Sequence, residues 1–239
     1  MKKIALVLLI TAAISNAQSW EKNKVKGNGN VITQTRNTAE YDEIITGGQF
    51  SVQLIAAPEG KIIMEGDENL LDLIKVEVEN NKLKVYVDKG TWFDSRGDKI
   101  KITIPFEKIS RIDFGGSGDL KTKDLIAVNN LEVHLSGSGN VDLQTETTSL
   151  KAVLSGSGTL EIDGKTTNLE AKLSGSGGIE CKKLVSQNAT ATLSGSGQID
   201  LNCTKSLEAK VTGSGNINYT GKPETTIKKV TGSGEISNF

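Results

Sequence analysis

The segment Leu154–Ile162 reads LSGSGTLEI and recurs, with substitutions, along the C-terminal half of the chain. Its Gly-Ser-Gly tripeptide begins at Gly116, Gly137, Gly156, Gly175, Gly195, Gly213 and Gly232, so that successive copies are 18 to 21 residues apart. A near-fixed interval of this length is typical of a repeat architecture in which each repeat is one structural unit. Flexible Gly/Ser linkers lack the apolar pattern that flanks each copy here, so a linker is excluded.

Apolar residues flank each tripeptide with a period of two. The fourth residue after the first glycine is Leu120, Val141, Leu160, Ile179, Ile199, Ile217 or Ile236. The second residue before it is Phe114, Leu135, Leu154, Leu173, Leu193, Val211 or Val230. The residues between them are mostly polar, so each repeat is predicted to form a strand, a tight turn and a second strand with alternate side chains buried.

The regular interval decides how these strands pair. An antiparallel meander has the same alternation, but only stacked coils require the same residue type at the same point of every turn. Glycine is expected at the turn because a sharp corner takes positive φ, which is unfavourable for a residue with a Cβ. Residues 111–239 are therefore predicted to form an all-β, single-stranded parallel β-helix, a solenoid with Gly-Ser-Gly-centred coils of about 19 residues.

The N-terminal half lacks the repeat but is also rich in strands. Alternation predicts strands at Gly47–Leu54, Lys61–Glu65, Lys75–Glu79, Lys82–Val87 and Lys99–Ile104, with one helical turn at Leu70–Ile74. Asn80-Asn81 is typical of a two-residue hairpin turn. We expect residues 41–110 to form irregular coils that cover one end of the stack as part of the same domain, because an open end would invite aggregation. A separate β-sandwich is the alternative.

Residues 1–17 have the layout of a secretory signal peptide: Lys2 and Lys3, the apolar run Ile4–Ile10, and small residues up to Ala17. The run is too short for a transmembrane helix, which takes about 20 residues. Residues 18–40 are expected to be an N-terminal segment that contributes part of a first strand. The mature protein is thus expected in the periplasm, on the outer cell surface or in the medium, without a transmembrane segment.

Composition excludes several partners and chemistries. The chain has 28 basic and 29 acidic residues, interspersed, so no long-range field favours nucleic acid. No glycine-rich phosphate loop is present, and two cysteines with one distant histidine do not make a metal site, so no cofactor is expected. The single histidine, His134, is predicted to point outward from its strand. No serine has the context of a nucleophile, which excludes serine hydrolase chemistry.

Outward-facing acids give the one pattern compatible with catalysis. The same position on successive coils is occupied by Asp142, Glu161, Glu180 and Asp200, then by Asn218 and Ser237. Enzymes that cleave polysaccharides use paired carboxylates, so a polysaccharide lyase or hydrolase on a β-helix is the rival hypothesis. A solvated face that discourages lateral pairing is the simpler interpretation.

The two cysteines, Cys181 and Cys203, fall on neighbouring coils and are offset by two positions along the strand. Export permits a disulfide between them. The competing interpretation is two small apolar residues within the stack, because free cysteine packs as a buried hydrophobic residue.

Two features of one N-terminal segment are candidate binding sites. Trp92 and Phe93 are candidates for contact with carbohydrate or protein, or alternatively for plugging the end of the stack. Arg96, Gly97 and Asp98 follow in what is expected to be an exposed loop. This tripeptide is the one that integrins recognise, and it is equally ordinary turn chemistry.

The recurring Leu-Ser-Gly-Ser-Gly-x-Ile-x-Leu unit, together with Gly48–Val52 and Gly66–Leu70, resembles the head GIN domain family of putative auto-transporter adhesins. The resemblance extends from Tyr41 to Phe239. It implies a right-handed β-helix similar in shape to pectin lyases but without their catalytic residues, in exported proteins common among Bacteroidetes.

Regular architecture without a catalytic constellation favours a non-enzymatic adhesion or scaffolding module. Its flat faces are expected to contact an unidentified cell-surface glycan, a protein, or further copies of the same chain as a homo-oligomer.

Overall fold

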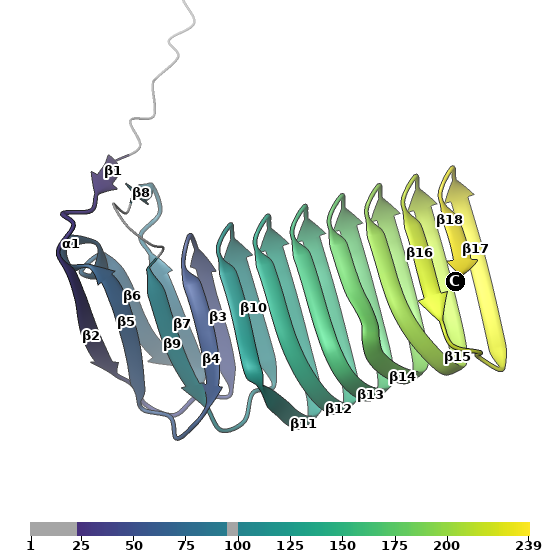
Figure 1. Cartoon of the computed structure of the whole chain (residues 1–239), viewed down its shortest axis with the longest axis horizontal. Coiled ribbons are helices and arrows are strands. Elements are labelled where there is room, and N and C mark those ends of the chain that lie inside the picture. Colours follow the sequence, from purple (N-terminus) through teal and green to yellow (C-terminus); the bar gives the residue numbers. More distant parts are fainter. Residues whose placement is uncertain (1–22, 95–99) are drawn as a thin grey trace, which may run out of the picture.

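The computed structural model describes residues 23–94 and 100–239, which form a parallel β-solenoid (Figure 1). The predicted all-β fold with stacked coils of about 19 residues is confirmed. The expected signal peptide and the tripeptide at 96–98 lie outside the described residues. No helix in the described part of the chain is long and apolar enough to cross a membrane.

The regular coils pair in parallel with equivalent residues opposite each other. Leu154 lies opposite Leu173, and Gly156 lies opposite Gly175. Each complete coil is one long, bent strand that ends at the first glycine of the next turn. The strands are β10 (Arg111–Gly116), β11 (Asp119–Gly137), β12 (Asn140–Gly156), β13 (Thr159–Gly175), β14 (Gly178–Gly195), β15 (Gln198–Gly213), β16 (Asn216–Thr220), β17 (Thr225–Gly232) and β18 (Glu235–Asn238).

The Gly-Ser-Gly turns form one corner of the solenoid, along the top of Figure 1. The carbonyl oxygen of Gly137 accepts hydrogen bonds from Ser157 N at 2.9 Å and Gly158 N at 3.1 Å, and the other turns repeat this pattern. The φ of Gly137 is +121°, which confirms the expected positive φ of the first glycine. The second glycine is needed for close approach, since a Cβ on Gly139 would lie 2.5 Å from a carbonyl oxygen of the preceding coil.

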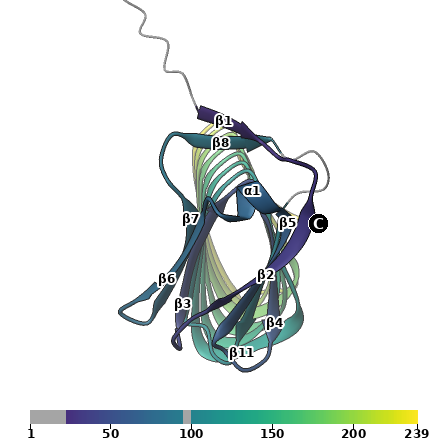
Figure 2. The same ribbon diagram turned by 90° about the vertical axis from the view of Figure 1, so that its left-hand side faces the viewer.

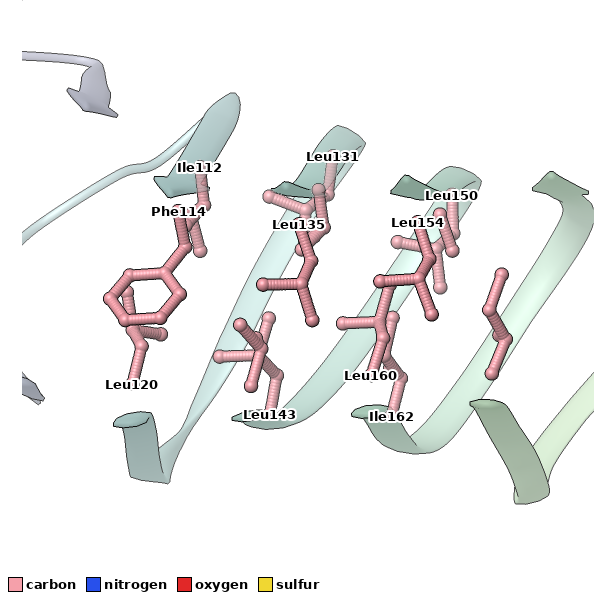
Figure 3. Close-up of a cluster of buried hydrophobic side chains, with 14 of the residues drawn as sticks. Ile112, Phe114, Leu120, Leu131, Leu135, Leu143, Leu150, Leu154, Leu160 and Ile162 are labelled. Atoms are coloured by element: carbon pink, nitrogen blue, oxygen red, sulfur yellow. The ribbon is translucent and has the colours of Figure 1, made fainter. Parts of the chain in front are cut away.

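Apolar side chains from successive coils form columns inside the solenoid (Figure 3). One column contains Phe114, Leu135 and Leu154, and another contains Leu143 and Ile162, all of them 1% exposed or less. Burying such a side chain contributes about 1.5–3 kcal/mol. Because each inner coil shares its buried surface with two neighbours, the coils stabilise one another.

The stack begins one coil earlier than the Gly-Ser-Gly repeats indicate. The strands β3 (Glu43–Gly48) and β4 (Ser51–Ala56) pair in parallel with β10 and β11, which places the turn at 47–50 against the turn at 115–118. The predicted strand Gly47–Leu54 is therefore wrong as a continuous strand. The chain turns at Gly48, whose φ is +128°.

Antiparallel pairs close the N-terminal end of the stack, which faces the viewer in Figure 2. Strand β2 pairs with β5, β5 with β9, and β6 with β7 in this way, whereas β3 with β7, β4 with β9 and β1 with β8 are parallel. The elements are β1 (Asn23–Lys26), β2 (Val31–Asn37), β5 (Lys61–Asp67), α1 (Glu68–Leu71), β6 (Ile74–Glu79), β7 (Lys82–Val87), β8 (Thr91–Asp94) and β9 (Lys101–Phe106).

Most of the predicted N-terminal elements are present, with shifted ends. Asn80 and Asn81 have φ of 51° and 60°, as a type I′ hairpin turn between β6 and β7 requires. The helical turn expected at Leu70–Ile74 begins earlier, at Glu68. Strand β9 does not stop before Pro105, as predicted, but continues to Phe106. Strand β5 pairs only with residues 101–103 of β9, so the missing N–H of the proline removes no hydrogen bond on that side.

The last coil differs from the others at its inward positions. Lys228 lies opposite Ala209, at the end of an inward column that is apolar in the other coils and alanine in the last four of them, and Asn238 lies opposite Tyr219. All of β17 is exposed, because no further coil covers it. The C-terminal end of the solenoid thus presents polar side chains where the inner coils have apolar ones.

Both cysteines are free, buried thiols. Cys181 lies opposite Leu201, whereas Cys203 lies opposite Ser186, because the register shifts between Cys181 and Val185. The Sγ of Cys203 donates toward the carbonyl oxygens of Gln187 and Ser206. This arrangement supports the interpretation of the cysteines as small residues of the stack.

We expect neither thiol to react with a disulfide reagent in the native protein at pH 8. Burial, followed by nearby carboxylates, raises the pKa of Cys181 to about 12, so almost no thiolate forms at that pH. In denaturant without reductant, titration should then find two thiols per chain. Finding no thiols until a reductant is added would show that the two residues are bridged.

Candidate binding groove

A groove opens between the first turns of the solenoid and the connection from β7 to β8. Its volume of about 800 Å³ lies within the range of roughly 300–1,000 Å³ that is typical of small-ligand sites. One side is corner backbone at Gly48, Gly116 and Gly137, with Ser117 and Ser138 beside it. The other side is residues 84–93, which include the predicted pair of aromatic residues.

Strand β8 places those aromatic residues in different environments. Phe93 is half-buried and stacks on the buried Phe50, with ring centroids 5.8 Å apart and an interplanar angle of 28°. Trp92, its neighbour on the opposite face of the strand, is 45% exposed. Phe93 therefore packs against the end of the stack, and Trp92 offers an accessible aromatic surface at the groove.

Two ion pairs hold the outer side of the groove. Lys24 on β1 contacts Asp94 on β8 at 2.9 Å, and this hydrogen bond and charge lower the pKa of the Asp94 carboxyl. Lys75 on β6 contacts Asp88 at 2.8 Å, just before the connection turns. Figure 2 shows β1 and β8 lying together across the top of the solenoid. Exposed pairs of this kind contribute little to stability, so they orient this segment more than they stabilise it.

Thr46 and Lys89, two of the polar residues that line the groove, form no side-chain hydrogen bond or ion pair with a described residue. Thr46 is 4% exposed, and its Oγ1 is buried without a hydrogen-bond partner. Lys89 is exposed and forms no ion pair within the described residues, whereas Lys84 is paired with Glu79. Sequence analysis missed Thr46 and Lys89. The similarity of Gly47-Gly48 to Gly115-Gly116 is the signal that could have located this coil and its turn.

The acidic column predicted on the outer face is in register. Asp142 lies opposite Glu161, which lies opposite Glu180. Lys183 contacts Glu161 at 3.2 Å, and Lys182 contacts Asp200 at 3.2 Å. Both lysines lie between Cys181 and Val185, where the register of β14 shifts. This irregular part of the strand places their positive charges beside Glu161 and Asp200. No group of three metal-binding side chains occurs among residues 23–94 and 100–239.

His134 lies in a second, mixed-charge cluster on the opposite flank. Its Nε2 is 2.7 Å from Glu132, and Arg111 contacts both Glu132 and Asp113 at 2.9 Å. His134 is thus on the outer face as expected, although it is partly covered by its neighbours. The cluster belongs to a column of alternating charge across six strands, which consists of Lys82, Glu43, Arg111, Glu132, Lys151 and Glu170.

This column should make stability depend on pH. Hydrogen bonds from Lys151 and His134 and the charge of Arg111 lower the pKa of Glu132 from 4.5 to about 2. Because the pKa of Glu132 is lower in the folded than in the unfolded state, its ionised carboxylate stabilises the fold fully above about pH 4.5. This stabilisation is lost as the pH falls toward about 2. We expect Glu132→Gln to lower the free energy of unfolding by about 1 kcal/mol at pH 7, with a smaller difference from wild type at pH 3.

Urea unfolding at both pH values measures this difference. Glu146→Gln is the control, because its pair with Lys165 at 2.9 Å is more exposed and lies outside the cluster. If Glu132→Gln lowers the free energy of unfolding equally at pH 7 and pH 3, the ionised Glu132 carboxylate is not the source of the stabilisation.

Solved structures share this architecture over nearly their whole length. A putative adhesin from Bacteroides fragilis is 28% identical, with a TM-score of 0.84 over 90% of this chain and 100% of that one. A putative lipid binding protein from Parabacteroides distasonis is 28% identical, with a TM-score of 0.76 over 91% of this chain and 100% of that one.

A putative adhesin from Parabacteroides merdae, 20% identical with a TM-score of 0.72 over 91% of this chain and 99% of that one, shows the same fold. No curated protein matches the sequence. The family model described as "Putative auto-transporter adhesin, head GIN domain" matches residues 40–223, and the chain belongs to that family.

Proposed function

We propose that the protein is an exported, non-enzymatic binding module that acts in adhesion, and that the groove beside Trp92 is its contact site. The observation that carries the proposal is an accessible tryptophan at a groove of about 800 Å³ on an otherwise regular solenoid. Aromatic side chains supply large contact areas at a low cost in conformational entropy, which suits a binding site.

Two similarities support a binding role. The family is described as one of putative adhesins, and the B. fragilis relative carries the same description. The P. distasonis relative is described as a putative lipid binding protein, which agrees with a groove whose exposed surface is mostly apolar. The signal-peptide pattern at residues 1–17 supports export.

The test is binding of labelled protein to intact cells of the producing organism and to an array of immobilised glycans and envelope proteins. We expect Trp92→Ala to reduce binding about tenfold or more, as is usual when a central aromatic contact is removed. Leu125→Ala is the control, because Leu125 is 48% exposed but does not line the groove. Equal binding by wild type and Trp92→Ala would overturn the groove as the contact site.

The rival polysaccharide lyase or hydrolase is tested on the same proteins. Turnover of acidic or neutral glycans that is abolished by Asp142→Asn or Glu161→Gln would establish the acidic column as catalytic. We expect no turnover, because Lys183 contacts Glu161, and Lys182 contacts Asp200, which is only 4% exposed.

A further inference from the structure

We propose that the groove binds a single-chain anionic amphiphile, with the chain against the aromatic wall and the anionic group at Lys89. This inference rests on the proposed function, since it names the chemical class of ligand for the same groove. Three observations carry it: the apolar lining, one uncompensated positive charge, and one buried hydroxyl without a partner.

The lining suits an alkyl chain better than a sugar. Val87, Trp92 and Phe93 line one side of the groove, and Phe50 and the glycine backbone of the corner line the other, so most of the surface it offers is carbon. Sugars need several converging hydrogen-bond partners, because each buried hydroxyl left unpaired costs free energy. An alkyl chain needs only burial, which contributes about 0.8 kcal/mol per CH₂.

The charge at the groove favours an anion. The other charged side chains that line it are already paired, Asp88 with Lys75 and Lys84 with Glu79. Lys89 lies next to Asp88 in the lining and forms no ion pair with any described residue. A carboxylate or phosphate group would supply the missing counter-charge through a charge-assisted hydrogen bond.

The buried hydroxyl of Thr46 is a polar group in a mostly apolar wall of the groove. Most buried polar atoms in proteins are hydrogen-bonded, and one that is not calls for an explanation such as a bound partner. Thr46 lines the groove, and its Oγ1 is closed to water in this structure. A change of the Thr46 side chain to a neighbouring χ1 rotamer exchanges the positions of its hydroxyl and methyl groups. The hydroxyl can then form a hydrogen bond with a ligand oxygen without movement of the backbone.

Titration calorimetry with decanoate, decyl phosphate and decanol tests this assignment. These probes share a chain length and differ in the headgroup, so they separate a fatty-acid source from a phosphorylated one. We expect at least one anion to bind up to about fivefold more tightly than decanol, since a partly exposed charge pair contributes up to about that factor. Lys89→Gln should remove that preference, and Lys205→Gln, an exposed lysine outside the groove, should not.

The threonine is tested by a pair of matched variants. Thr46→Val and Thr145→Val each remove a buried, unpartnered hydroxyl, and each should raise the melting temperature. Only Thr46→Val should also weaken anion binding, because Thr145 lies outside the groove. A merely structural role for Thr46 predicts the rise in melting temperature without any change in affinity, and that result would overturn its assignment.

The outcomes separate this inference from the proposed function. Binding of no probe at millimolar concentration overturns the amphiphile, while the effect of Trp92→Ala on cell binding still decides the function. If Trp92→Ala leaves probe binding unchanged, the probe binds outside the groove, and this result also overturns the amphiphile assignment. Equal affinities for both anions and decanol would overturn the role of Lys89.

Discussion

Replacing Gly175 by alanine should destabilise the protein by on the order of 4 kcal/mol or more, which is exceptional for a single methyl group. Gly175 has a φ of +130°, a conformation that is unfavourable for any residue with a Cβ. The added Cβ would also lie 2.3 Å from the carbonyl oxygen of Gly156 in the preceding coil. That oxygen accepts hydrogen bonds from Ser176 and Gly177, so the clash cannot be relieved without opening the corner.

Gly178 provides a matched control three residues further along the same coil. A Cβ there meets nothing closer than a Glu180 side-chain oxygen at 3.9 Å, and its φ is not positive. Gly178→Ala should therefore leave the free energy of unfolding unchanged or raise it by up to about 1 kcal/mol, because alanine lowers the conformational entropy of the unfolded chain. Urea unfolding of both variants, followed by circular dichroism, measures the difference. A cost below about 1 kcal/mol for Gly175→Ala would contradict the close stacking at the corner.

The repeat could be predicted because its cause is local and recurs in every coil. The first glycine is required by the backbone of the turn, and Leu135, Leu154 and their equivalents are required by the shared interior. Each copy repeats the same physical constraint, so the sequence shows both the coil length and the parallel register. The bent, almost continuous strands follow from the same alternation of side chains.

The N-terminal coil could not be predicted in this way, because its turn has lost the tripeptide. Gln49 and Phe50 stand where Ser117 and Gly118 stand in the next coil. Phe50 tolerates that place because no earlier Gly-Ser-Gly turn packs against it, and its ring stacks on Phe93 instead. That contact joins segments more than forty residues apart in the sequence, so no local pattern indicates the groove that it borders.

Lys228→Val should convert the protein into a species that associates end to end. In the four preceding coils the equivalent position is Ala152, Ala171, Ala191 or Ala209, each directly opposite the next. The Lys228 ammonium group lies 4.7 Å from the ring centroid of Tyr219 and donates to the Ile236 carbonyl oxygen at 3.3 Å. Any chain stacked on this end would bury that charge, which costs several kcal/mol without a counter-ion.

The strand that carries this lysine would otherwise be a ready site for pairing. Strand β17 has a free edge, and Ile227 and Val230 on it are 59% and 43% exposed. Exposed edges with apolar side chains pair with other chains unless a charge that points inward prevents it. Valine at 228 would remove that charge and extend the apolar interior to the open end, and its β-branched shape is one that strands favour.

Lys229→Val is the matched control, because it makes the same change in charge one residue away, on the outer face opposite Lys210. Sedimentation from micromolar to millimolar concentration should show growing dimers for Lys228→Val and unchanged behaviour for Lys229→Val. Association of both variants alike would point to net charge as the cause. A monomeric Lys228→Val would mean that other polar groups at this end, such as Asn238, are enough to prevent stacking, and that the inward lysine is not the deciding residue.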